Sequence, residues 1–115
     1  MKNEEKDCQS AMLPVLDAMY VLQGKWKLPI ILALTFHNRG FRELEREVTG
    51  ITPRMLSKEL KHLEENQLIE RTVHNSKPIK VEYSLTEHGK TLKSVIIALR
   101  DWGLIHRKTI MSIKK

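Results

Sequence analysis

The sequence of 115 residues predicts a mainly helical α+β fold, because the spacing of its apolar residues changes twice along the chain. Up to Gln67 these residues recur every three or four positions, which is typical of amphipathic helices. From Leu68 to Thr86 they alternate with polar residues, as in short strands with one buried face. After Thr86 the helical spacing returns. The expected order is therefore several helices, one hairpin and a long final helix within a single domain.

The composition favours an anionic partner. Lys and Arg number 20 against 14 Asp and Glu, which leaves a formal net charge of +6, and the sequence pI is about 9.6. Nucleic acids and membrane surfaces both attract a protein of this charge. The aromatic content of 5% argues against a protein that stacks single-stranded bases on exposed rings.

Several classes of protein are not expected. No apolar run reaches the roughly 18 residues that a membrane span needs, and the segment MKNEEKDCQS is too acidic for a signal peptide, so we expect a cytoplasmic protein without membrane association. The single cysteine, Cys8, cannot form an internal disulfide, and no Cys/His spacing suggests a metal site, so neither metal nor cofactor is expected. No carboxylate is paired with a nucleophile or a phosphate-binding glycine loop, which argues against an enzyme.

The N-terminal region is expected to divide at residue 12. Residues 1–12 are interpreted as a flexible polar tail and residues 13–115 as the folded domain, with the first helix starting near Pro14. The apolar residues of this helix cover too wide a surface for one packed stripe: Val15, Leu16, Met19, Tyr20 and Leu22. We expect its second face to be buried against another subunit.

A second helix is expected from about Lys25. It is apolar on almost every side from Leu28 to Phe36, so we expect it to be the central buried helix. Pro29 is compatible with this helix only in the first turn, where a missing N–H removes no helical hydrogen bond. The segment HNRG then turns the chain, and FRELEREV is expected to form a short third helix.

The segment from Thr52 to Gln67 predicts a helix with one basic face. Thr52 can cap it, and Pro53 suits the first helical position. At about 100° per residue the leucines fall on one stripe, and the opposite side receives Arg54, Ser57, Lys58 and Lys61. The last turn is acidic, so the leading turns suit insertion into a DNA major groove. An ordinary amphipathic surface helix with solvated charges is the alternative.

The third helix and this basic helix are joined by a few residues that include a glycine, which forms a helix-turn-helix pattern. The strands LIERTVH and KVEYSLT follow as a hairpin. Its tip is basic, because Lys77 and Lys80 lie there with Arg71 nearby. A hairpin directly after a recognition helix corresponds to the wing of a winged helix.

Thr86 is expected to cap one long final helix. Its apolar residues at helical spacing are Leu92, Val95, Leu99 and Trp102. Further apolar residues lie outside that stripe: Ile96, Ile97, Leu104 and Ile105. This surplus again predicts a partner subunit, so the expected fold is a winged helix-turn-helix with additional N- and C-terminal dimerisation helices. The expected dimer contacts include Leu16, Met19, Leu99 and Trp102.

The segments GKWKLPIILAL, RGFREL, ITPRMLSKELKHLEENQLIER and VEYSLTEHG resemble, in this order, the HxlR family of winged-helix transcription regulators, which are relatives of the MarR group. The similarity covers about residues 13–103. It implies a homodimer joined by the first and last helices, with two recognition helices in successive major grooves and two wings at the flanks. Members typically carry a cysteine immediately before the Pro-Val of the first helix. This chain has Leu13 there and its only cysteine further upstream, so a thiol sensor cannot be assigned by position.

The candidate DNA contacts have different expected roles. Base reading is expected from Arg54 and Ser57, with Thr52 and Pro53 at the entry of the helix. Phosphate contacts are expected from Lys58, Lys61, Lys77 and Lys80, with Arg42 as a further candidate. His62, at the border of the basic face, is expected either to contact DNA or to be solvated.

The sequence therefore predicts a sequence-specific transcription regulator that binds double-stranded DNA as a homodimer on a pseudo-palindromic operator. Repression is the expected effect, and activation is the alternative. The alternative is a winged-helix interaction module that binds protein or RNA. Two kinds of effector are expected: a small molecule at the dimer interface, or an electrophile that reacts with Cys8. The alternative for Cys8 is that it is an incidental thiol in a mobile tail. Trp26 and Trp102 are interpreted as core residues or as the lining of an effector pocket.

Overall fold

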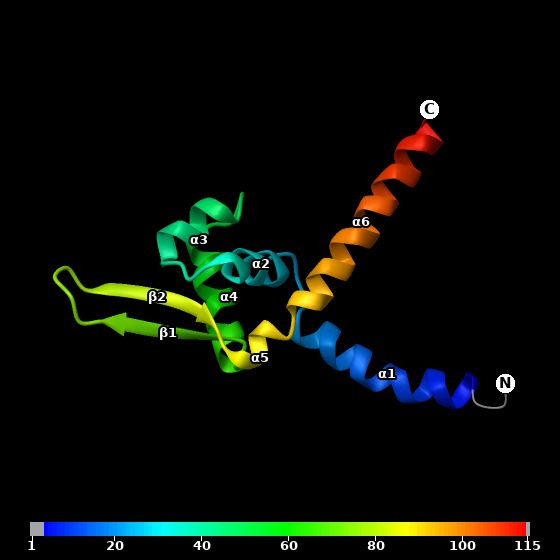
Figure 1. Cartoon of the computed structure of the whole chain (residues 1–115), viewed down its shortest axis with the longest axis horizontal. Coiled ribbons are helices and arrows are strands. Elements are labelled where there is room, and N and C mark those ends of the chain that lie inside the picture. Colours follow the sequence, from blue (N-terminus) through cyan, green and yellow to red (C-terminus); the bar gives the residue numbers. More distant parts are fainter. Residues whose placement is uncertain (1–3, 115) are drawn as a thin grey trace.

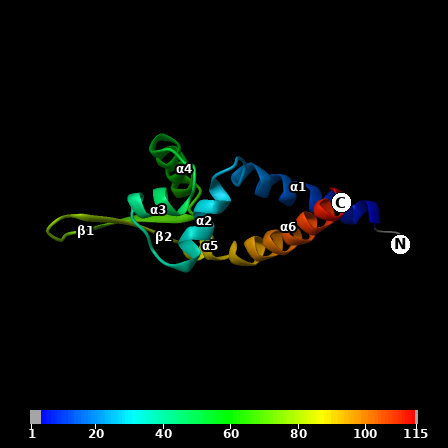
Figure 2. The same ribbon diagram turned by 90° about the horizontal axis from the view of Figure 1, so that it is seen from above.

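The computed structural model describes residues 4–114, and their side chains from residue 7 to residue 113. The elements are α1 (Glu4–Val21), α2 (Lys27–Phe36), α3 (Phe41–Glu47), α4 (Pro53–Glu65), β1 (Ile69–His74), β2 (Lys80–Leu85), α5 (Glu87–Lys90) and α6 (Lys93–Lys114). Helices α2 to α4 and the hairpin form one body. Helices α1 and α6 project from it as two arms, away from the tip of the hairpin (Figures 1 and 2). This arrangement confirms a mainly helical winged helix-turn-helix.

Helix α2 forms the centre of the core, as the sequence predicted. Ile30 and Ile31 are completely buried, and Pro29 lies in the first turn, because the helix starts at Lys27. The surrounding elements contribute further buried side chains, namely Leu44, Val48, Ile51, Leu56, Leu60, Leu63, Leu68, Ile69 and Tyr83. The body therefore has its own hydrophobic core, and the parts of the arms next to it add partly buried side chains such as Val21 of α1 and Ile96 of α6.

The start of α4 agrees with its predicted capping. The Thr52 hydroxyl accepts a hydrogen bond from the Met55 backbone N–H at 3.2 Å, and Pro53 is the first helical residue. The three stripe leucines of α4 are buried at 0–2% exposure. Because one face of α4 packs into the core, the opposite face is held towards solvent in a fixed orientation.

The hairpin is antiparallel, with a register that runs from Ile69 opposite Leu85 to His74 opposite Lys80. Its base is fixed to the turn after α2. The Arg39 N–H donates to the Tyr83 carbonyl at 3.1 Å, and the Tyr83 N–H donates to the Arg39 carbonyl at 2.8 Å. The base is therefore anchored by backbone bonds, whereas the tip extends into solvent (Figure 1).

The predicted start of the first helix is wrong, because α1 begins at Glu4 and not near Pro14. The residues from Glu4 to Met12, expected as a tail, are helical, and residues 1–3 lie outside the described residues. This segment is rich in Glu, Lys, Gln, Ala and Met, which favour helix. Pro14 removes one helical hydrogen bond, but helix can form on both sides of it.

The prediction of one long helix after Thr86 is also wrong. Thr86 caps α5, accepting from the Gly89 N–H at 2.9 Å, but α5 ends at Lys90 and α6 begins at Lys93. A Cβ on Gly89 would lie 2.0 Å from the Leu68 carbonyl oxygen, so α5 packs directly on the backbone before β1. Backbone bonds from Thr91 to His88 and from Leu92 to Gly89 then close tight turns, and α6 leaves in a new direction.

The two tryptophans have different environments. Trp26 is partly buried against the core, and the Lys25 Nζ lies 4.7 Å from the centroid of its ring. Trp102 is 61% exposed on α6, so within one protomer its interpretation as a core residue is wrong. Its ring stacks on His106, with centroids 5.0 Å apart. Trp102 thus belongs to the surface of an arm.

Candidate nucleic-acid interface

The outer face of α4 collects the residues that the sequence assigned to DNA. Arg54, Ser57, Lys58 and Lys61 are all exposed. Together with His62 and Glu65 they line an open groove of about 540 Å³. The helical period places this basic face opposite the buried leucines, and Glu65 adds negative charge only at the exit of the helix. The first turns of α4 are therefore the most positive part of the face.

Thr52 and Pro53 lie where the chain enters α4. Both are exposed, and the positive end of the helix dipole is directed towards any group that approaches there. The Thr52 hydroxyl oxygen already accepts the capping hydrogen bond, so its O–H remains available as a donor. The entry of α4 is thus suited to a phosphate or to the acceptor atoms of a base.

His62 stands at the border of the basic face, beside Glu59, a neighbour that the sequence analysis missed. Its Nδ1 lies 3.8 Å from Glu59 Oε1, and the same carboxylate oxygen accepts from Lys27 Nζ at 2.8 Å. Lys27 and Glu59 are 7% and 8% exposed. The sequence did carry one signal of this buried pair. Lys27 lies at the start of the apolar run of α2, and Glu59 lies among the leucines of α4.

The tip of the hairpin exposes Lys77 and Lys80, as predicted. Lys80 Nζ lies 3.6 Å from Glu82 Oε2, and His74 Nε2 lies 3.2 Å from Glu82 Oε1. The hydrogen bond from His74 is the main cause that lowers the pKa of Glu82, and the Lys80 charge lowers it further. Among the described residues, no carboxylate pairs with Lys77. Lys77 is therefore the more available of the two lysines.

Arg42 is exposed in the first turn of α3, on the surface of the body. The neighbouring Arg39 has a different role. It is buried, its Nε donates to the Ala33 carbonyl at 2.9 Å, and its Nη1 lies 3.4 Å from Glu47 Oε1. Arg39 closes the turn between α2 and α3, and only Arg42 of these two arginines can contact a ligand outside the body.

Residues 21–111 match the sequence profile of the HxlR-like helix-turn-helix family. The chain belongs to the HxlR family. Two regulators of Bacillus subtilis (strain 168) are similar to it. YybR is 36% identical over 101 residues, which cover 88% of this chain and 81% of that protein. YodB is 35% identical over 95 residues, which cover 82% of this chain and 85% of that protein.

Solved structures of two similar regulators have the same fold as this HxlR protein. The redox regulator HypR in its reduced form superposes with a TM-score of 0.80 at 36% identity, covering 86% of this chain and 98% of that one. The reduced form of B. subtilis YodB gives a TM-score of 0.70 at 35% identity, covering 75% of this chain and 84% of that one. The HxlR protein is a DNA-binding helix-turn-helix transcription regulator and, like its relatives, not an enzyme. No helix in residues 4–114 is long and apolar enough to cross a membrane.

Proposed function

We propose that this HxlR protein is a homodimeric repressor that recognises a pseudo-palindromic operator through α4. The observation that supports this most is the basic face of α4, which is exposed in full while its other face is fixed in the core. A dimer bound across a promoter excludes polymerase, which makes repression the simplest outcome. Because the partner is chromosomal DNA, the proposal places the protein in the cytoplasm.

The proposed contacts follow the position of each side chain. Arg54 and Ser57, in the leading turns of α4, read base edges, with Thr52 and Pro53 at the entry. Five further exposed cations are proposed to meet phosphate: Arg42, Lys58, Lys61, Lys77 and Lys80. His62 lines the same groove from its border, beside Glu59.

The proposed dimer interface lies on the arms. In a monomer Leu16, Met19, Leu99 and Trp102 are 51%, 62%, 48% and 61% exposed. On α6, Leu99 and Trp102 continue a helical stripe that also includes Val95, His106 and Ile110. Apolar surface of this extent is rarely left uncovered in a soluble protein. A two-fold partner that contributes the same helices would cover it.

Cys8 is the proposed point of attack for an oxidant or an electrophile. It is exposed, and it lies on α1 at helical spacing from Met12, Val15 and Met19, on the side proposed for the partner. Two similar solved structures are named as a redox regulator and as diamide-treated YodB. A noncovalent ligand between the subunits is the alternative switch.

The deciding experiment is footprinting on the DNA that flanks the gene of the protein, followed by competition. A protected palindromic duplex should stay bound at about 0.15 M salt in the presence of excess nonspecific DNA. Equal competition by every duplex would contradict the proposal and favour an interaction module for protein or RNA.

A further inference from the structure

Helix α4 exposes one large apolar side chain that the contacts proposed above do not use. Met55, in its first turn, is 40% exposed, whereas the leucines of the same helix are buried. Met55 is also absent from the partly buried apolar residues that pack against the core. The core therefore does not explain why an apolar residue occupies this position.

Met55 lies at the edge of the basic face of α4. At about 100° per residue it falls between the leucine stripe and that face, on the same side of the helix as Lys58 and His62. Lys58 follows three residues later, so the two residues are neighbours on the helix surface. The Met55 backbone N–H donates to the Thr52 hydroxyl at 3.2 Å, which fixes the point where the side chain leaves the helix. Met55 thus belongs to the turn of α4 that is proposed to enter the major groove first.

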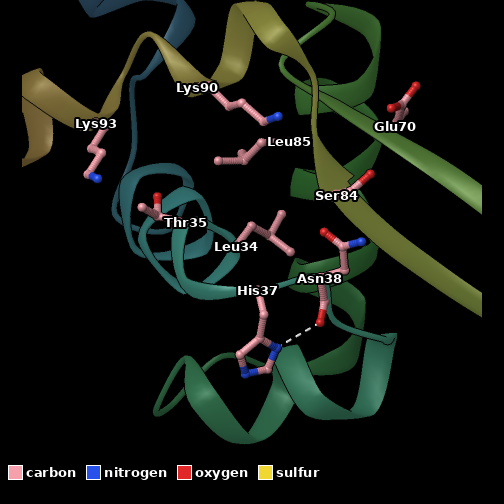
Figure 3. A pocket seen from close by; sticks show the side chains of 9 residues that line it. All are labelled: Leu34, Thr35, His37, Asn38, Glu70, Ser84, Leu85, Lys90 and Lys93. Carbon is pink, nitrogen blue, oxygen red and sulfur yellow. Dashed lines mark hydrogen bonds between the residues drawn. The ribbon is translucent and has the colours of Figure 1, made fainter.

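The apolar side chains that α2 exposes have a different setting. Leu32 and Phe36 line two hollows whose other residues come from α2, α3, α6 and the adjoining turns. A larger pocket of about 520 Å³ lies between α2, the base of the hairpin and the start of α6 (Figure 3). No residue of α4 lines any of these three hollows. A ligand or protein segment that fills them would leave Met55 uncovered, so Met55 needs a partner that approaches α4 itself.

We propose that Met55 reads the 5-methyl group of one thymine in each operator half-site, an inference that rests on the proposed binding of α4 in the major groove. The thymine methyl is the apolar group that the base pairs present in that groove. Arg54 and Ser57 offer hydrogen-bonding groups, which do not detect a methyl group. The unbranched, polarizable side chain of methionine adapts well to such a contact. Met55 therefore adds a preference for thymine to the bases that Arg54 and Ser57 recognise.

The test replaces thymine by uracil in the operator, one base pair at a time, because uracil lacks only the methyl group and keeps every hydrogen bond. Fluorescence anisotropy at fixed salt gives the affinity of each duplex. For the wild type, uracil at one position should weaken binding about fourfold per half-site, the effect of losing one buried methyl-sized group. Met55→Gln, which keeps a good helix former, should bind both duplexes equally. Met55→Leu, which stays apolar, should keep the preference for thymine.

Lys77→Ala is the matched control, because it removes a proposed phosphate contact outside α4. It should weaken the thymine and uracil operators in the same proportion and keep the wild-type ratio between them. Three results would overturn the inference: no uracil position weakens the wild type, the loss persists in Met55→Gln, or Met55→Leu behaves like Met55→Gln. All three are measured on an operator that the wild type binds specifically. A wild type that prefers no duplex would instead contradict the proposed function, and this inference with it.

Discussion

Lys27 Nζ lies 2.8 Å from Glu59 Oε1, and both side chains are almost completely buried. The same ammonium group is 3.4 Å from the Gln23 carbonyl. This buried pair connects the start of α2, the turn after α1 and the middle of the DNA-facing helix. The arm and the basic face of α4 are thus joined through one desolvated interaction.

Glu59→Leu should lower the free energy of unfolding by about 3 to 5 kcal/mol, because it leaves the Lys27 ammonium buried without a carboxylate to neutralise its charge. The double variant Lys27→Met with Glu59→Leu should recover most of that loss. Urea unfolding of the wild type, both single variants and the double variant measures the coupling. Additive losses in the double variant would show that the pair has no mutual stabilisation.

Arg54→Ala should weaken operator binding by about 1 to 3 kcal/mol and relax the preference at one base pair of each half-site. The reason is the position of Arg54 in the first turn of the exposed face. Competition with operators that are substituted at single positions measures both the loss of affinity and the change in base preference. Lys108→Ala, which removes a cation from α6, serves as the control. An unchanged specificity ratio would remove Arg54 from base reading.

Lys77→Ala should weaken binding to all sequences alike, because the tip of the hairpin meets phosphate and not base edges. The slope of log affinity against log salt should fall by about one for each subunit. Anisotropy titrations at several salt concentrations, on operator and nonspecific duplexes, check this. A change in the preferred base would place Lys77 among the base-reading residues instead.

Leu99→Arg should convert a dimer into a monomer, because it puts a charge into the centre of the proposed apolar face of α6. Sedimentation at micromolar concentration should show a dimer for the wild type and for Lys108→Ala. Operator sites should have half-site centres about 10 to 10.5 base pairs apart, or a multiple of that. A monomeric wild type that binds its operator fully would refute the dimer.

Diamide or quinone treatment should change operator affinity in the wild type and not in Cys8→Ser. Covalent change at Cys8 alters the side of α1 that carries Met12 and Met19, and with it the proposed contact between subunits. Affinity before and after treatment is compared in both proteins. Equal responses, or none in either, would exclude Cys8 and favour a noncovalent effector.

The sequence predicted those parts of the fold that depend on local chemistry. Thr52 and Pro53 specified the start of α4, and alternation around Tyr83 specified β2. The break after α5 was missed, because it depends on the contact of Gly89 with the distant Leu68 carbonyl. The ion pair to Glu59 was missed for the same reason, since its partner lies 32 residues away. Local periodicity can show that a charge such as Glu59 falls on an apolar stripe, but it does not identify the distant group that it meets.

The basic face of α4 was easier to predict from the sequence than the pocket that lies between α2, the base of the hairpin and the start of α6. Helical period alone brings Arg54, Lys58 and Lys61 to one face. The pocket beside Lys93 draws residues from helices and strands that are far apart in the sequence, and its position depends on the direction that α6 takes after the break. No spacing rule within one segment could have revealed it.

The two backbone bonds between Arg39 and Tyr83 have an evolutionary consequence. Because both are main-chain hydrogen bonds, they hold the base of the hairpin without help from the side chains at its tip. The residues between His74 and Lys80 are exposed and contribute nothing to the core. The length and the charge of the hairpin tip can therefore change during evolution with little loss of folding stability. Descendants of one such protein can therefore change how strongly the tip holds DNA while the rest of the molecule stays unchanged.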